Sequence, residues 1–272
     1  MINSGAKLVI QPGVTVKSTM DVRNSNAGSI VNNGTLITSK SFTNETASNC
    51  SGNGGIFVGE NWTNTAFFNA GSTAVTFNEV PNGAINAGAS TFNGVHLIKS
   101  ANHYNYLGAP MVINDTLNFL AANTFLALNG FNLTINQVNG AMSDRFIVTN
   151  DAGLAVKNLT GISYTFPIGY GTGFSGGVFS VSRFSPVTIE ASNSLINQQF
   201  QAGYYFRSPS SATFPAGAPF SVSSLDPGVC RVSDKEYWDI NGAVPVKITF
   251  TWDIASNLSA MLSNLSDLRI VG

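Results

Sequence analysis

The stretch "VGENWTNTAFFNAGSTAVTF", residues 58–77, decides the fold class of this chain. Single aromatic and β-branched residues stand between Asn, Gly, Thr and Ser, and Glu60 is its one charged residue. Aromatic and β-branched residues favour strands, whereas Gly and Asn tolerate the left-handed backbone of tight corners. The stretch therefore predicts short extended segments joined by frequent corners.

The same texture covers the first half of the chain, where helical periodicity is nearly absent. Three- to five-residue apolar runs alternate with turn formers such as "NAG", "NNG" and "PNG"; among the runs are "KLVI" (7–10), "TLI" (35–37), "GIFV" (55–58) and "MVI" (111–113). Similar surroundings recur, at uneven intervals, around Thr15, Thr35, Thr63 and Thr76. A hairpin meander would need longer strands. We therefore expect a β-solenoid over residues 1–140, with apolar side chains inward and Asn and Thr laddered between coils.

After residue 140 the apolar runs become longer. "FSPVTIEAS" (184–192) alternates over its whole length, and "VKITFTWDI" (246–254) follows at a spacing typical of sandwiches. We expect a β-sandwich-like domain over 141–272, incomplete at its C-terminus. "NLSAMLSNLSDL" (257–268) fits either a short helix or a loop. Both ends of the chain look cut, so a segment of a longer polypeptide is expected.

The composition narrows the classes of partner. The 272 residues are 43% hydrophobic but only 10% charged, and the net charge is −1. Scattered charges of both signs argue against binding to nucleic acid or to an anionic membrane. No apolar run is long enough for a transmembrane helix, so membrane insertion is not expected. "MINSGAKLVIQPG" (1–13) does not have the charged start and long apolar run of a signal peptide.

Two segments resemble a known family. "VGENWTNTAFFNAGSTAVTFN" (58–78), followed by "STFNGVHLIKS" (90–100), resembles a repeat of large secreted surface proteins of Bacteroidota. "DRFIVTNDAGLAVKNL" (144–159) and "EYWDING" (236–242) resemble the β-domain that often follows it. The chain departs from the repeat at "NTAFFN" and at Gly94, where Asn is usual.

The resemblance implies an extracellular, adhesin-like or scaffold polypeptide at the cell surface, exported by the type IX secretion route. It also implies O-glycosylation at Asp-Ser/Thr-apolar sites. Asp115-Thr116-Leu117 fits that pattern, which makes Thr116 a glycosylation candidate. The alternative is that Asp115 is simply a polar residue at the start of a strand.

Catalytic signals are weak. Glycoside hydrolysis needs two carboxylates about 5 to 9.5 Å apart. The acidic residues of the predicted solenoid are widely spaced and carry no motif: Asp21, Glu45, Glu60, Glu79 and Asp115. Neither His96 nor His103 accompanies a serine elbow. We therefore predict no catalytic residues and no cofactor, and we treat a polysaccharide lyase or hydrolase as an alternative.

A calcium site is the one metal hypothesis. "SDKEYWDING" (233–242) offers oxygen ligands from Asp234, Glu236 and Asp239, although the spacing of an EF-hand is absent. The competing interpretation leaves Asp234 and Glu236 in solvent and packs Trp238 inward. Cys50 and Cys230 form no zinc motif, and they are either bridged or two independent thiols.

"NHYNYLG" (102–108) interrupts the apolar runs with Tyr104 and Tyr106, which are candidate stacking platforms for glycans. The competing interpretation is that these two tyrosines cap a local core where a coil is irregular. Tyr204 and Tyr205 form a second candidate pair of platforms. The sequence thus predicts a non-enzymatic surface protein, part of an adhesin or a surface filament. Its partners would be other surface proteins, copies of itself or glycans. A carbohydrate-binding module is the first alternative.

Overall fold

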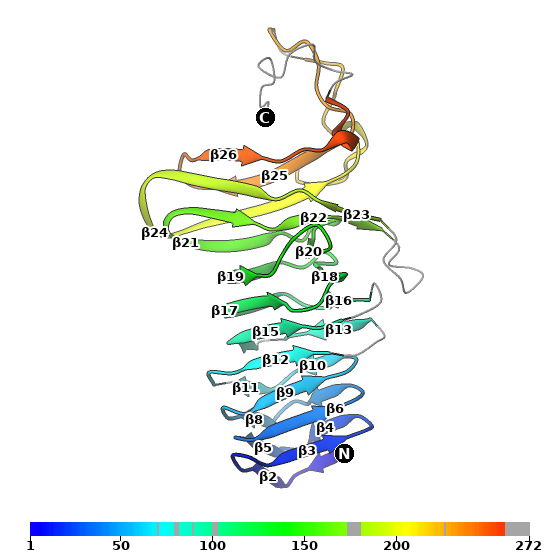
Figure 1. Cartoon of the computed structure of the whole chain (residues 1–272), viewed down its shortest axis with the longest axis vertical. Helices are drawn as coiled ribbons and strands as arrows, with labels where there is room; N and C mark the ends of the chain where they lie inside the picture. The colour runs from blue at the N-terminus through cyan, green and yellow to red at the C-terminus, as the bar shows by residue number, and fades with distance from the viewer. Residues whose placement is uncertain are drawn as a thin grey trace.

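The computed structural model is an elongated stack of β-coils, with the N-terminus at one end (Figure 1). It describes residues 1–69, 71–78, 82–88, 90–99, 103–172, 181–225 and 227–258. Strands make up 55% of the chain and helices 3%, and about eight turns form a β-solenoid. The predicted all-β class and the predicted solenoid are confirmed. Within the described ranges, no helix is long and apolar enough to cross a membrane.

Each coil contributes parallel strands to three faces. Face 1 contains β1 (Ile2–Ser4), β4 (Val22–Ser25), β7 (Phe42–Asn44), β10 (Trp62–Asn64), β13 (Gly83–Asn86), β16 (Tyr104–Leu107), β18 (Thr124–Ala127), β20 (Arg145–Val148) and β22 (Ile168–Thr172). Face 2 contains β2 (Lys7–Ile10), β5 (Ser29–Asn32), β8 (Asn49–Ser51), β11 (Phe67–Asn69) and β14 (Thr91–Phe92). Face 3 contains β3 (Thr15–Ser18), β6 (Thr35–Thr38), β9 (Gly55–Val58), β12 (Ala74–Phe77) and β15 (Gly94–Leu97).

Two longer strands cover faces 2 and 3 together. β17 (Met111–Phe119) pairs with β14 through its first half and with β15 through its second half. β19 (Leu133–Asn139) pairs with β17 along both halves, across an irregularity between Ile113 and Thr116. The corner between the two faces is therefore a bulge in a continuous strand in these coils.

The core is built from columns of inward side chains, one from each coil. Val22 aligns with Phe42 and Phe42 with Trp62, and all three are fully buried. The rings of Phe42 and Trp62 stack with centroids 4.5 Å apart, and Phe68 meets Trp62 edge-on at 4.8 Å. Burial of such side chains contributes about 1.5–3 kcal/mol each. Single apolar residues at each strand therefore suffice to hold a narrow core.

A buried row of amides, the Asn ladder, follows the end of the face-1 strands in the first four coils. Each Nδ2 donates to the Oδ1 of the next coil: Asn3 to Asn24 at 2.8 Å, Asn24 to Asn44 at 2.8 Å, and Asn44 to Asn64 at 2.7 Å. The predicted laddering of Asn between coils is confirmed here. The ladder ends where Asn64 donates to the hydroxyl of Ser90. The buried amides of the ladder are thus paired with one another from coil to coil.

The corner beside the ladder shows why Gly is needed in "NAG" (26–28). Asn26 and Ala27 adopt the left-handed conformation, with φ of 52° and 60°. Gly28 does not, but a Cβ at this position would lie 2.5 Å from Oδ1 of Asn24. Gly28 therefore makes room for the ladder rather than for the turn itself.

The end of the solenoid differs from the prediction. Parallel pairing continues past residue 140, from β18 to β20 and from β20 to β22, so the coils extend beyond the expected boundary. β21 (Ala155–Phe166) pairs parallel with β19 at its first two residues, and along its other side it pairs antiparallel with β24 (Val187–Tyr205). β24 in turn pairs with β25 (Tyr237–Gly242) and β26 (Lys247–Phe250), and β23 (Val181–Phe184) pairs with β22.

The predicted β-sandwich is not confirmed. β24, β25 and β26 extend the sheet of faces 2 and 3 in the antiparallel sense, as the upper part of Figure 1 shows. Two short 3-10 helices lie in this part, η2 (Pro209–Ser211) and η3 (Ile254–Ser256). Most of the predicted helix or loop over 257–268 lies outside the described residues.

Candidate functional site

The outer surface of face 1 carries the tyrosines that the sequence singled out. In a strand, residues two apart point to the same side, so Tyr104 and Tyr106 both point outward from β16. Tyr104 aligns with Phe125 and then Phe146 in the next two coils. In the neighbouring column, three residues are aligned from coil to coil: Tyr106, Ala127 and Val148.

The Tyr104 column forms a small cluster outside the main core. Phe125 and Phe146 meet edge-on with centroids 5.1 Å apart, and Phe184 continues the cluster at 5.5 Å from Phe146. Tyr104 is only 4% exposed, and burial, together with the neighbouring Tyr106, raises the pKa of its hydroxyl. Tyr104 therefore packs mainly in a local core, whereas Tyr106 is half-buried and presents part of its ring to solvent.

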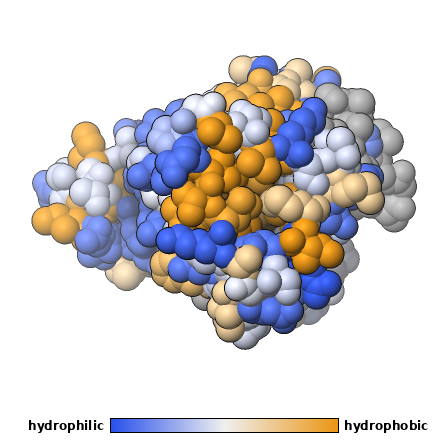
Figure 2. All heavy atoms as spheres, turned by 90° about the horizontal axis from the view of Figure 1, so that it is seen from below, coloured by the Kyte–Doolittle hydropathy of each residue, from blue (hydrophilic) through white to orange (hydrophobic). Residues whose placement is uncertain are grey.

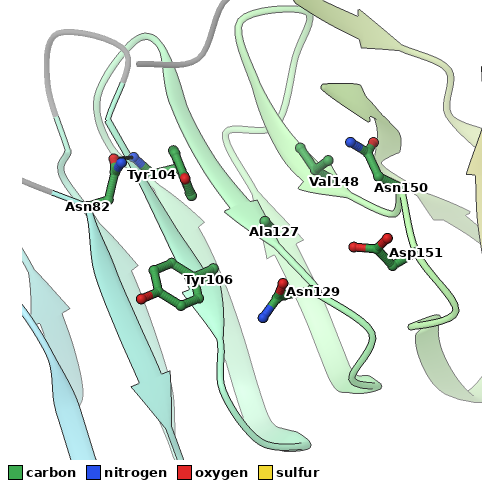
Figure 3. Close-up of a pocket in the computed structure, with 8 residues that line it drawn as sticks. All are labelled: Asn82, Tyr104, Tyr106, Ala127, Asn129, Val148, Asn150 and Asp151. Carbon is green, nitrogen blue, oxygen red and sulfur yellow. Dashed lines mark hydrogen bonds between the residues drawn. The ribbon is translucent and has the colours of Figure 1, made fainter. Parts of the chain in front are cut away.

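Next to Tyr106 the surface is hollowed into what we call the face-1 groove, with a volume of about 450 Å³ (Figure 3). Small side chains create it, because Ala127 and Val148 follow Tyr106 in the column. The described residues that line it are Asn82, Tyr104, Tyr106, Ala127, Asn129, Val148, Asn150 and Asp151. The groove thus combines one accessible ring, small apolar residues and several amides.

Hydrogen bonds hold the amides of the face-1 groove in place. Asn129, at a left-handed corner with φ of 51°, donates from Nδ2 to the Leu107 carbonyl at 3.0 Å. Asn150 accepts from the Gly171 backbone N–H at 3.0 Å and donates to the Gly171 carbonyl. Oδ1 of Asn82 accepts from the Tyr104 backbone N–H at 2.9 Å. The polar rim is therefore pre-organised by backbone contacts.

The corner that carries Asp151 is also fixed. Oγ1 of Thr149 accepts from the Tyr204 backbone N–H at 2.8 Å, and the Asn150 carbonyl accepts from Nη2 of Arg207 at 3.0 Å. Asp151 itself is exposed and is the only charged residue among the described lining residues. The groove is consequently polar and carries a single negative charge.

The second tyrosine pair does not form a platform. Tyr204 and Tyr205 are fully buried, which contradicts their prediction as stacking residues. The Tyr204 hydroxyl donates to Oε2 of Glu236 at 2.6 Å, and burial raises its pKa. The aromatic pattern of "GYYF" (203–206) therefore reflects packing of β24.

The calcium candidates are not brought together. Nη2 of Arg183 lies 3.0 Å from the buried carboxylate of Glu236, which contradicts the placement of Glu236 in solvent. Asp239 is buried and accepts from Nδ2 of Asn241 at 2.8 Å, whereas Asp234 is exposed beside Lys235. In the part of the chain that the structure describes, no three His, Cys, Asp or Glu residues are placed to hold a metal ion.

The acidic residues along the solenoid have structural neighbours. Glu45 pairs with Arg23 at 2.6 Å, and Glu60 pairs with Lys40 at 2.5 Å, each one coil apart. Asp21 accepts from the Ser41 backbone N–H at 3.0 Å. These carboxylates connect neighbouring coils at the surface. Glu79 lies outside the described residues.

The remaining candidates are not among the described residues that line the groove. Asp115 is exposed and Thr116 is half-buried at the bulge of β17, so glycosylation of Thr116 stays a prediction. His96 points outward from β15 and is half-buried, and His103 lies with Nδ1 3.2 Å from Oδ1 of Asn82. Cys50 is buried and Cys230 is exposed, and both are free thiols.

The first coil offers a second surface of interest, the coil-1 end face, formed by Met1, Leu8 and Val16. These side chains lie in the same inward columns as Val22, Ile30 and Leu36 of the next coil, which are 0% exposed. Without a coil on their other side they are only half-buried. Figure 2, which views the molecule from this end, shows apolar residues gathered in its middle.

The comparisons with known proteins identify no relative: no protein-family model, no curated protein and no solved structure matches the chain.

Sequence reasoning found Tyr106 but missed Asn129, Asn150 and Asp151. The sequence held a usable pattern, because Tyr106, Ala127 and Val148 occupy the same position in consecutive coils. Asn129 follows Ala127, and Asn150 follows Val148, by the same short distance in the sequence. A repeat length read from these residues would have placed them beside Tyr106.

Proposed function

We propose that the chain is a non-enzymatic, extracellular structural segment of an adhesin or surface filament, exported by the type IX route. The observation that carries this proposal is the coil-1 end face. It presents a cross-section of the apolar core together with the open edges of β1, β2 and β3. Such an end favours the addition of a further coil, since each coil of a solenoid contacts only its neighbours.

The hydrogen bonds of the Asn ladder all run in one direction, which determines how a further coil could stack on the coil-1 end face. All rungs donate from Nδ2 toward the later coil, so Asn3 directs its donor inward to Asn24. Among the described residues, no donor reaches Oδ1 of Asn3, which is the unused acceptor of the ladder. A coil with Asn at the same position, stacked in the same direction, would supply that donor. Two copies meeting end face to end face would instead oppose two acceptors.

The surface chemistry supports an exposed structural role. Only 10% of the residues are charged, so much of the polar surface consists of Asn, Ser and Thr. The resemblance to Bacteroidota surface repeats also supports an extracellular structural role. The ion pairs that exist, such as Arg23 with Glu45, join neighbouring coils. Hydrolysis of a glycoside by two carboxylates is disfavoured in the face-1 groove, where Asp151 is the single acid among the described lining residues.

Surface location is tested on intact cells of the source organism. Antibodies raised against the purified chain should label unbroken cells, and external protease should remove the label. Labelling that appears only after lysis would contradict the proposal. The stacking of coils is tested separately, by the measurement that closes the Discussion.

A further inference from the structure

We propose that the face-1 groove binds an uncharged saccharide, with Tyr106 under a sugar ring and Asn129 and Asp151 on its hydroxyls. This inference is independent of the proposed structural role, because the groove lies on the side of coils 5 to 8 and not on an end. It rests on the shape, the lining and the rigidity of the groove.

The lining matches the two kinds of surface on a sugar. A sugar ring has an apolar face of C–H groups, which packs on an aromatic ring, and a rim of hydroxyls that both donate and accept. Tyr106 is half-buried, so part of its ring is available, and among the described residues no hydrogen bond is made by its hydroxyl. Ala127 and Val148 leave space beside the ring. Figure 3 shows Asn129 and Asp151 bordering the same space.

The polar atoms that are available to bind a ligand lie along one border of the face-1 groove. Nδ2 of Asn129 donates to the Leu107 carbonyl, which orients the amide and leaves Oδ1 as an acceptor. The carboxylate of Asp151 makes no ion pair within the described part of the chain, and it can accept from two hydroxyls. Asn150, engaged on both sides by Gly171, fixes the corner rather than contacting ligand.

The dimensions and rigidity fit a short segment of a saccharide. Tyr106, Ala127 and Val148 are consecutive along the solenoid axis, and coils repeat at about 4.8 Å, so the column spans about 10 Å. The rim is held by Thr149–Tyr204 and Asn150–Arg207 contacts before any ligand arrives. A pre-organised site loses less entropy on binding.

The charge of the groove selects among saccharides. Asp151 is the only charged residue among the described lining residues, and the Arg207 guanidinium contacts the Asn150 carbonyl rather than lining the groove, so a uronate or sulfate would meet a like charge there. Neutral sugars avoid this repulsion. We therefore expect neutral polysaccharides to bind in preference to acidic ones.

The experiment uses the whole chain in affinity electrophoresis and calorimetry. The neutral probes are β-glucan, mannan, xylan and N-acetylglucosamine oligomers, and the acidic probes are pectate and alginate. At least one neutral probe should bind more tightly than either acidic probe. Tyr106→Ala should weaken that binding about tenfold by removing the ring, whereas Tyr106→Phe, which keeps it, should stay within about threefold of the wild type.

Phe67→Ala is the matched control, since Phe67 is a 58% exposed ring on face 2 and its removal should leave binding unchanged. Thermal unfolding verifies that every variant is folded. The proposal is overturned if no neutral probe binds, if acidic probes bind better, or if folded Tyr106→Ala binds like the wild type. Surface labelling of cells without saccharide binding would remove this inference and leave the proposed structural role intact.

Discussion

Nδ2 of Asn24 donates to Oδ1 of Asn44 at 2.8 Å, although the two residues are 20 positions apart, and both side chains are fully buried. Asn44 repeats the same bond to Asn64 at 2.7 Å. The relationship sets one residue of each coil directly over its equivalent in the next. It thereby fixes the register of the first four coils, because a shifted coil would leave buried amides unpaired.

Asn44→Ala should destabilise the chain by about 3 kcal/mol, because it removes two ladder bonds and the bond to the Phe67 carbonyl, and it takes away the donor to the buried Oδ1 of Asn64. Denaturant unfolding measures the change. Asn193→Ala is the control, since Asn193 is exposed on β24, and it should change stability by less than about 0.5 kcal/mol. Equal effects of the two substitutions would show that the ladder does not stabilise the fold.

Gly28→Ala should cost about 2 kcal/mol, since the added Cβ would lie 2.5 Å from Oδ1 of Asn24 and would displace the ladder. Gly55→Ala serves as the matched control. Its nearest obstacle is the edge of the Phe57 ring at 3.3 Å, which can move. A Gly28→Ala protein as stable as Gly55→Ala would contradict the assigned role of Gly28.

Trp62→Ala should destabilise by about 4 kcal/mol, because it opens a cavity among Phe42, Phe68 and Phe92. Trp252→Ala removes the same side chain from a site where it is 47% exposed, and a much smaller loss is expected there. Comparison of the two unfolding midpoints checks the prediction. If Trp252→Ala lost as much stability as Trp62→Ala, the assignment of Trp62 to the stabilising core would be contradicted.

Cys50 should be unreactive in the folded protein. Burial raises the pKa of its thiol from 9.0 to about 12, so the reactive thiolate is scarce at pH 8. A thiol reagent should therefore modify Cys230 alone in native protein and both cysteines after denaturation. Rapid modification of Cys50 in the folded chain would contradict its burial.

The same shift predicts a dependence of stability on pH. Between pH 9 and about 12 the unfolded chain releases the Cys50 proton while the folded chain keeps it. The unfolded state then binds fewer protons, so the free energy of unfolding falls as pH rises through this window. Cys50→Ala should reduce the slope of that fall, as measured by denaturant unfolding at several pH values.

Much of the fold was predictable from local residue choice. "WTN" (62–64) and "AVTF" (74–77) are short strands in the structure, and Asn129-Gly130 forms the left-handed corner that its sequence predicts. The boundary at residue 140 was wrong because the long alternating strands looked like a separate sandwich. β21 in fact pairs on one side with β19 of the solenoid ladder at Ala155 and Val156, and on its other side it pairs with β24 from Ala155 to Phe166.

The candidate site was less predictable, because its residues belong to different coils. Tyr106 stood out by type, whereas Asn129 and Asp151 resemble the many other corner residues of the chain. Only coil stacking brings them to one groove. Packing into a local core was one interpretation of Tyr104 and is what the structure has, whereas Tyr204 was expected as an exposed platform and is fully buried.

The most direct test of the central claim is to add one coil. A copy of residues 22–41, placed before Met1, carries the equivalents of Asn24, Ile30 and Leu36 in register with the end face. It should raise the melting temperature by about 5 °C or more, because it covers Met1, Leu8 and Val16 and adds a ladder rung. A control copy with Lys at the positions of Val22, Ile30 and Leu36 should give no gain. An unchanged or lower melting temperature with the native copy would contradict the claim that this end accepts a further coil.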